Sequence, residues 1–576
     1  MTIVVKLLFV LRLVFKQAAL CDLLELRMIC FYLFCFFPLQ VLPQEETLDA
    51  IKVEADRSLK VLKEQPIPAY YISYRVQVKE NYSIISRFGK LQSRNQQRES
   101  YYNLTVRVGS NEMDNTRKIE GNYFTFDQNG RAPIEYKPFA LKMILWEATN
   151  KAYMSAIQKY ECVKAISTIS SDRAKSGDFT RETPDQYYEE PISFDGLKFD
   201  TQKWEEKVKI YSLVFGNNKD LVDGTATLNV ELIRKYFVDT DGAVIAQNSI
   251  AYRLLLTTKT IADDGMELPV YKSYFGMEEK HLPSDTVVIG DAQQISILAS
   301  RLKNAPVAAS YSGPAILSPK VSAVFFHEIL GHRIEGSRLK QETDAQTFKD
   351  KLGEKVLSEE ISVIYEPQLK EYEGIPLSGN YVFDDEGVRG QQVNIIENGI
   401  LKSFLMSRIP IDGFQKSNGH GRGDIFRNTE TRQSNMIIKS SHLLQEKELR
   451  KMLIDEIKRS GNEYGYLFDE VIGGFTNTER TLPNAFNVTP LVVYRIYANE
   501  RPDELVRGVN LIGTPLTMLS QIVACGSRYD IFNGYCDAPS GMLPVSCVAP
   551  SLFIKKIETQ KKSIPFSNPP LLERPL

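Results

Sequence analysis

Two histidines and a glutamate with a spacing suited to metal chemistry lie in residues 325–336. His327, Glu328 and His332 form an HExxxH pattern, and the pair accounts for two of only five histidines in 576 residues. In the related HExxH pattern the histidines are four residues apart, bind zinc from one helical face, and flank a general base. Here, one extra residue would turn the imidazoles of a regular helix about 140° apart. They can share a metal only if the helix is widened or broken, and Gly331 makes such a change easiest.

The alternative for these histidines is a chance pair that is simply hydrogen-bonded in the interior. The flank 321–326, Val-Ser-Ala-Val-Phe-Phe, is apolar enough for a buried helix. Polar side chains on a buried helix need partners, because an unpaired buried polar group is costly. This requirement favours a metal site on a helix predicted over residues 320–333.

Two histidines do not complete a catalytic zinc site, which usually has three protein ligands and one water. The candidates by residue type are Cys536, Cys525, Cys547, Glu335 and His420. Cys536 falls in a glycine- and proline-rich stretch that is interpreted as a loop able to approach a metal. Cys525 and Cys547 have more apolar neighbours and are more typical of small core residues. These considerations alone leave the third ligand open, with a modest preference for Cys536.

Composition and periodicity indicate an α+β protein with two domains. The chain has 70 basic and 72 acidic residues, so its net charge of -2 does not favour nucleic-acid binding. An amphipathic helix and β-rich runs predict an N-terminal α/β domain with an antiparallel sheet over residues 45–300. Glycine-punctuated strands after residue 301 predict a largely antiparallel β domain that carries the HExxxH helix, over residues 301–576.

Residues 1–44 form a separate hydrophobic segment. The run 28–38 follows a basic residue and carries no charge, but it is short for a membrane span. We therefore interpret residues 1–44 as a signal peptide or membrane anchor, which predicts an exported protein that is periplasmic or membrane-associated. A cytoplasmic protein is the alternative.

Several motifs in a consistent order resemble the TldD/PmbA metallopeptidase family, specifically its TldD-like branch, which carries the metal motif. The matching segments are 326–336 around HExxxH, 383–387 (Phe-Asp-Asp-Glu-Gly), 396–402 (Ile-Glu-Asn-Gly-Ile-Leu-Lys), 417–422 (Ser-Asn-Gly-His-Gly-Arg), 432–435 (Arg-Gln-Ser-Asn) and the closing Gly-Tyr-Cys at 534–536. The resemblance is strongest from about residue 305 onward.

The resemblance implies a zinc-dependent peptidase that binds one Zn²⁺, with another divalent metal as an alternative. It makes His327, His332 and Cys536 the ligands and Glu328 the catalytic base. The expected substrates are peptides or unfolded polypeptides held extended in a cleft. The expected assembly is a homodimer or a heterodimer with a related family member.

Three further residues are predicted to support the site. Glu335, three residues after His332, is expected to orient that imidazole, and His420 and Arg422 are expected to contact substrate. The rival function is a non-catalytic peptide-binding or assembly protein with a structural metal, which a closed four-ligand site would indicate.

Overall fold

A computed structural model gives the structure of the chain and describes residues 46–118, 128–135, 137–169, 176–341, 344, 346–479, 485–499 and 501–562. The hydrophobic segment 1–44, with the signal peptide or anchor predicted there, falls outside these ranges. Within them, no helix is long and apolar enough to cross a membrane. This finding corrects the prediction of an exported or membrane-associated protein.

Residue contacts divide the chain into residues 1–49 and 50–576, and both large sheets belong to the second unit. The predicted mixed α+β class with antiparallel sheets is confirmed. The described helices are α3 (Glu46–Leu62), α4 (Pro138–Ile169), α5 (Thr201–Leu213), α6 (Asp285–Asn304), α7 (Pro319–Ile329), α8 (Gly336–Leu339), α9 (Glu446–Ser460) and α10 (Pro515–Ser520).

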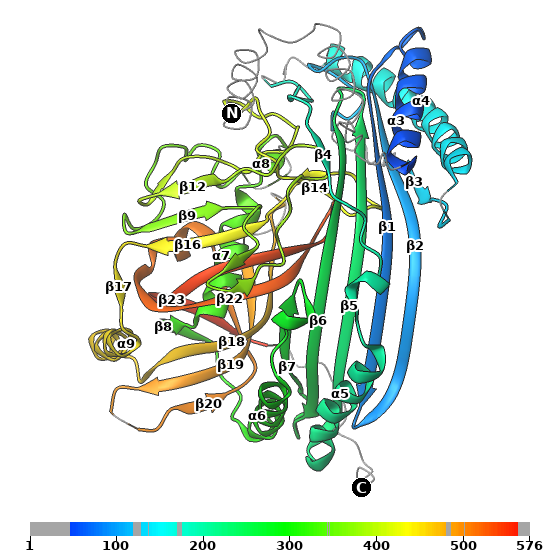
Figure 1. Cartoon of the computed structure of the whole chain (residues 1–576). Helices are drawn as coiled ribbons and strands as arrows, with labels where there is room; N and C mark the ends of the chain where they lie inside the picture. The colour runs from blue at the N-terminus through cyan, green and yellow to red at the C-terminus, as the bar shows by residue number, and fades with distance from the viewer. Residues whose placement is uncertain are drawn as a thin grey trace, which may run out of the picture. The chain divides into compact units, whose positions relative to one another are not determined.

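Long paired strands form the first sheet (Figure 1), in the order β3-β2-β1-β5-β6-β4 with β7 beside β6. Every pair in it is antiparallel except β4–β6. The strands are β1 (Ala69–Arg87), β2 (Lys90–Val108), β3 (Gln128–Arg131), β4 (Gln186–Tyr188), β5 (Leu221–Asp239), β6 (Val244–Ile261) and β7 (Glu267–Gly276).

Side-chain alternation gives the first sheet two different faces. Along β5 and β6, buried residues such as Leu228 and Leu254 alternate with partly exposed ones. The buried set packs in one core with residues of α5 and α6, including Trp204 and Val288. The opposite face of β6 stays free of this core, and its residues line a cavity that also reaches the second sheet.

The second sheet follows the order β13-β12-β9-β16-β23-β21-β19-β18-β8 in the described part of the chain. Its strands are β8 (Tyr311–Leu317), β9 (Ile361–Tyr365), β12 (Val393–Glu397), β13 (Ile400–Leu401), β16 (Asn435–Ser440), β17 (Leu443–Leu444), β18 (Tyr464–Thr476), β19 (Phe486–Tyr497), β20 (Glu504–Val506), β21 (Val509–Gly513), β22 (Ile522–Ala538) and β23 (Gly541–Lys561). Two small hairpins are β10 (Glu371–Tyr372) with β11 (Ile375–Pro376), and β14 (Gly421–Arg422) with β15 (Glu430–Thr431).

Most pairs of this sheet are antiparallel, and three are parallel: β8–β18, β16–β23 and β17–β22. Because β8 also pairs with β23, the path β23-β21-β19-β18-β8 closes on itself. Asn398 and Gly399, a residue pair typical of hairpin turns, join β12 to β13 with positive φ at both residues.

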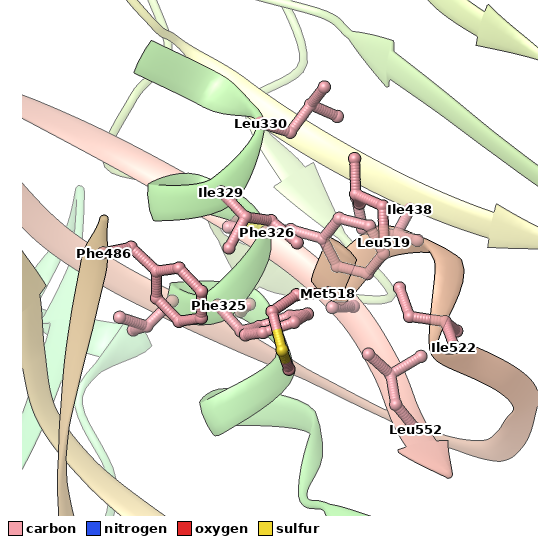
Figure 2. Packing of buried hydrophobic residues seen from close by; sticks show 14 of the residues in the cluster. Phe325, Phe326, Ile329, Leu330, Ile438, Phe486, Met518, Leu519, Ile522 and Leu552 are labelled. Atoms are coloured by element: carbon pink, nitrogen blue, oxygen red, sulfur yellow. The ribbon is translucent and has the colours of Figure 1, made fainter. Parts of the chain in front are cut away.

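Helix α7 packs against strands β18, β22 and β23 of the second sheet. Its residues Phe325, Phe326 and Ile329 are fully buried in the largest core cluster. Figure 2 shows these side chains beside Phe486 and Leu519. The helix begins at Pro319, a residue favoured in the first turn, directly after Ser318. The apolar flank of HExxxH therefore anchors the helix in the core of the second sheet.

A buried arginine connects the segment before β14 to the first sheet. Arg408 precedes β14 in the chain. Its guanidinium contacts Asp239, the last residue of β5, at 3.1 Å and Asp241, in the turn that follows, at 2.7 Å. It also donates to the Thr180 carbonyl at 2.9 Å and stacks on the ring of Phe179. The pair with Asp239 is buried on both sides, so its loss would leave an unpaired charge in the interior.

We predict that Arg408→Met lowers the free energy of unfolding by about 3–5 kcal/mol, because it leaves the buried Asp239 carboxylate without its ion-pair partner. Chemical denaturation followed by circular dichroism measures this change. The matched control is Arg389→Met, which removes an exposed pair with Asp185. That change should cost less than about 1 kcal/mol. Equal losses in the two variants would contradict a special role for the buried arginine.

Candidate metal centre

The helix that carries His327 stops being α-helical before it reaches His332. Helix α7 ends at Ile329, and Gly331–Arg333 forms a single 3-10 turn. The sequence predicted such a departure from regular helix near Gly331. The side chain of Arg333 donates to the carbonyl of Glu328 at 2.5 Å, which satisfies one of the carbonyls left open at the helix end. The break therefore turns His332 back toward His327.

A close contact explains why glycine stands at position 331. A side chain there would collide with the amide of Gln433, a buried residue next to the histidines. Gln433 accepts a hydrogen bond from the Tyr365 hydroxyl at 2.9 Å, and its Nε2 lies 3.5 Å from His327 Nε2. Gln433 belongs to the motif Arg-Gln-Ser-Asn at 432–435, but nothing in the sequence pattern predicts its contact with the histidines.

His327, His332 and Cys536 converge on one point. Cys536 Sγ lies 3.3 Å from His327 Nε2 and 3.3 Å from His332 Nε2. The three potential ligand atoms all lie within 4.8 Å of one another. Cys536 belongs to strand β22 and pairs with Leu543 of β23, so the sequence-based interpretation of a loop is wrong. The strand holds the thiol more firmly than a loop would.

The charges at this point favour a thiolate. Burial raises the pKa of the Cys536 thiol, but the neighbouring His332 and His327 outweigh it and hold that pKa well below its usual value. Burial alone raises the pKa of Cys547, and burial raises that of Cys525 to about 11. Since the thiolate is the metal-binding form, Cys536 is the one of these three cysteines prepared for a metal.

Glu335 lies behind His332, where the sequence predicted an orienting partner. Its carboxylate is 3.3 Å from His332 Nδ1 and 2.6 Å from Arg338 Nε. Although burial lowers the pKa of His332, the charges of Cys536 and Glu335 raise it to about 10. Although burial raises the pKa of Glu335, Arg338 and His332 lower it to about 2. The Nδ1 contact leaves His332 Nε2 directed at Cys536.

Glu328 is buried beside the three converging side chains, and burial raises the pKa of its carboxyl above the usual value. Strand β18 limits where this carboxyl can lie. A Cβ added to Gly474 would fall 2.5 Å from Glu328 Cγ and 2.6 Å from its Oε1. Gly474 was not among the residues predicted for the site, although the pair Gly473-Gly474 inside an apolar strand indicates that another part of the chain approaches the strand closely.

A cavity of about 2510 Å³ opens onto His327, His332, Cys536 and Glu328. Its walls near these residues are strand β18 from 470 to 476 and strand β22 from 530 to 538, together with β6 and β7 of the first sheet. The four side chains thus lie where a large ligand can reach them.

His420 and Arg422 lie away from this cavity. His420 is fully buried, with Nδ1 3.0 Å from Asn418 Oδ1 and Nε2 3.0 Å from Ser434 Oγ. Burial lowers its pKa to about 3. Arg422 donates to the carbonyls of Gln433 and Pro544. The structure does not bring these two residues to the other predicted site residues, and their contact with substrate stays a prediction.

The donor set fits a zinc ion. Zn–N bonds of about 2.0–2.1 Å and Zn–S bonds of about 2.3 Å at tetrahedral angles place ligand atoms roughly 3.5 Å apart. The two 3.3 Å separations from Cys536 Sγ agree with that spacing. Two imidazoles and a thiolate are ligands that zinc accepts, and three protein ligands beside a cavity leave a fourth position open.

The C-terminal part of the chain matches a known family. Residues 310–561 match the family model described as the PmbA/TldA metallopeptidase C-terminal domain. This range contains His327, Glu328, His332 and Cys536.

Curated relatives are similar over part of their length. A metalloprotease of Methanocaldococcus jannaschii is 32% identical over 40% of this chain and 47% of its own. One of Archaeoglobus fulgidus is 30% identical over 46% of this chain and 57% of its own. A protein of Saccharolobus solfataricus named zinc metalloprotease TldD homolog is 27% identical over 44% of this chain and 52% of its own. The chain thus spans about half the length of these relatives.

Solved structures share the fold over most of the chain. TldE from Thermococcus kodakarensis has a TM-score of 0.59 and 16% identity, and covers 89% of this chain and 100% of its own. A Thermotoga maritima protein described as a modulator of a DNA gyrase has a TM-score of 0.60 and 15% identity, over 88% of this chain and 99% of its own. At such identities the likeness concerns the fold alone.

We predict that Cys536→Ala lowers zinc affinity by more than about a hundredfold, because it removes a direct ligand and not merely an orienting partner. Purified protein is loaded with zinc, dialysed against a weak chelator and measured by mass spectrometry of the metal. The control is Cys162→Ala, which removes an exposed thiol on α4 and should keep the full metal content. Unchanged zinc in Cys536→Ala would mean that another residue completes the site.

Proposed function

Since the chain belongs to the TldD/PmbA metallopeptidase family, we propose that it is a zinc-dependent peptidase acting on peptides or unfolded polypeptides. The observation that carries this proposal is the convergence of three ligand side chains and one buried carboxylate at the wall of a large cavity. His327, His332 and Cys536 would hold the ion, and Glu328 would serve as general base. Another divalent metal in place of zinc is compatible with the same residues.

A bound zinc ion supplies Lewis acidity, which lowers the pKa of water to about 7 and polarises a substrate carbonyl. Glu328 accepts the proton of the attacking water on a carboxylate oxygen and then passes it to the leaving amine. Burial raises the pKa of Glu328 above its usual value, which moves this carboxyl toward the range where it can both accept and donate a proton. Gly474 leaves room for this carboxylate against β18, because a Cβ at that position would collide with it, and Glu335 holds the imidazole of His332 in place.

Extended substrate binding is supported by the edges of β18 and β22. Pairing of β18 with β8 stops at Phe468, so residues 470–476 are paired on one side only in the described structure. Among the described strands, residues 529–538 of β22 pair with β23 alone. A peptide backbone can add to such an edge through main-chain hydrogen bonds, which read little of the side-chain sequence. Assembly as a homodimer, or as a heterodimer with a related chain, is part of the proposal but rests on the resemblance.

The rival function is a peptide-binding protein with a structural metal. A structural zinc site is closed by four protein ligands. Among the described residues, the candidate metal ligands are three side chains, His327, His332 and Cys536, and they lie at the cavity wall. This arrangement favours hydrolysis over the rival.

We predict that Glu328→Gln lowers kcat on a short or unfolded peptide by at least about 10²–10⁴-fold, because the amide cannot accept the proton. Zinc content should stay unchanged, since the ligands are intact. Glu359→Gln, at an exposed carboxylate, is the matched control and should keep wild-type kcat. A Glu328→Gln variant that still cleaves peptides at the normal rate would overturn the proposed mechanism.

We also predict that Gly474→Ala lowers kcat/KM about a hundredfold, because the new methyl displaces the Glu328 carboxylate. The metal content should again be unchanged, which separates this effect from a loss of zinc. Gly473→Ala is the control, since a Cβ added there meets nothing within 4 Å. It should cost much less activity, and equal losses in both variants would argue against the contact with Glu328.

A further inference from the structure

Two exposed aromatic side chains lie next to the candidate metal centre, one on each strand that walls the cavity. Phe475 follows Gly474 on β18 and is 67% exposed, and Tyr535 precedes Cys536 on β22 and is 48% exposed. Both line the cavity. Apolar side chains exposed within a concave site are typical of surfaces that bind a ligand.

Strand geometry shows which way these rings point. Successive side chains of a strand point to opposite faces. The Cβ direction of Gly474 meets Glu328, and the thiol of Cys536 meets the histidines. Phe475 and Tyr535 therefore point away from the metal centre, on the opposite faces of their strands. The Arg253 guanidinium of β6 lies 4.9 Å from the centre of the Tyr535 ring, which agrees with a ring turned toward the first sheet.

The first sheet holds each strand at this place. Arg253 Nη1 donates to the Asn533 carbonyl of β22 at 3.1 Å. The hydroxyl of Tyr271, on β7, donates to the Val471 carbonyl of β18 at 2.8 Å. Both strands are thus fixed before any ligand binds, which lowers the entropy that binding would cost.

We propose that Phe475 and Tyr535 form an apolar subsite that selects substrates with a bulky apolar side chain beside the scissile bond. The inference rests on the proposed peptidase function and names its preferred substrate class. In an extended peptide, the two residues flanking the scissile bond point to opposite faces. One of them faces the metal centre and the other faces the two rings, so the preference applies to one flanking position and not to both.

The test uses zinc-loaded enzyme and quenched fluorescent peptides that differ only at the two flanking positions, with Leu, Phe, Ser or Asp at each. Mass spectrometry verifies that the cleaved bond is the same. For the wild type, kcat/KM should be about ten- to a hundredfold higher with Leu or Phe than with Ser at one position only. At the other position the ratio should stay within about threefold.

The variants Phe475→Ser and Tyr535→Ser should each reduce this Leu-to-Ser ratio by about tenfold or more, with a smaller change in kcat/KM for the Ser peptide. Phe475→Leu and Tyr535→Phe keep an apolar surface and should retain most of the selectivity. Phe139→Ser is the matched control, because Phe139 is 73% exposed on α4 and does not line the cavity. Arg253→Met, which frees the Tyr535 ring, should weaken selectivity without lowering zinc content.

The outcomes separate the two proposals. If zinc-loaded wild type cleaves Leu and Ser peptides equally well, the apolar subsite is refuted while the peptidase function stands. If the wild type prefers Leu but both Ser variants keep the same Leu-to-Ser ratio of kcat/KM, the subsite is also refuted, because other residues then select the substrate. If the wild type cleaves none of the peptides and no unfolded protein, the peptidase function fails, and the subsite fails with it.

Discussion

The central constraint on this structure is that two imidazoles five residues apart must meet a thiol about two hundred residues further along the chain. A continuous α-helix cannot do this, because it would point the imidazoles about 140° apart. The chain ends α7 at Ile329 and makes one 3-10 turn instead. Such a break exposes helix carbonyls in the interior, and Arg333 is buried there to satisfy one of them.

Burying this break requires charges that balance one another. His332, Glu335 and Arg338 form a buried chain of contacts in which each charge has an opposite neighbour. An unpaired member would be costly in a low-dielectric interior. The apolar residues of α7 hold the helix against the second sheet, and the polar residues after Ile329 hold the break. Packing and electrostatics therefore position different halves of the same motif.

Local pattern predicted the parts of this protein that depend on nearby residues. The apolar flank 321–326 indicated a buried helix before His327, and the spacing of the two histidines indicated its break near Gly331. Contacts between segments that are far apart in the sequence could not be predicted from such local patterns. Gly474 touches Glu328 only because β18 lies beside α7, and Cys536 belongs to a strand only because β23 pairs with it. His420 and Arg422 were selected from a motif that resembles the family, and a motif alone does not show whether a side chain is buried or faces a cavity. Their contact with substrate stays a prediction.

The first sheet is part of the site and not only a support for it. Residues of its strands β6 and β7 line the same cavity as the candidate metal centre, and Arg408 pairs with Asp239 at the end of β5. Arg253 and Tyr271 contact the two strands that flank the centre. A peptide between those strands would have one face toward His327, His332 and Cys536 and the other toward the first sheet. Hydrolysis would then occur on one face of the bound peptide, and side-chain selection on the other. Substitutions in the first sheet could therefore change which side chains are preferred without moving the metal-ligand residues.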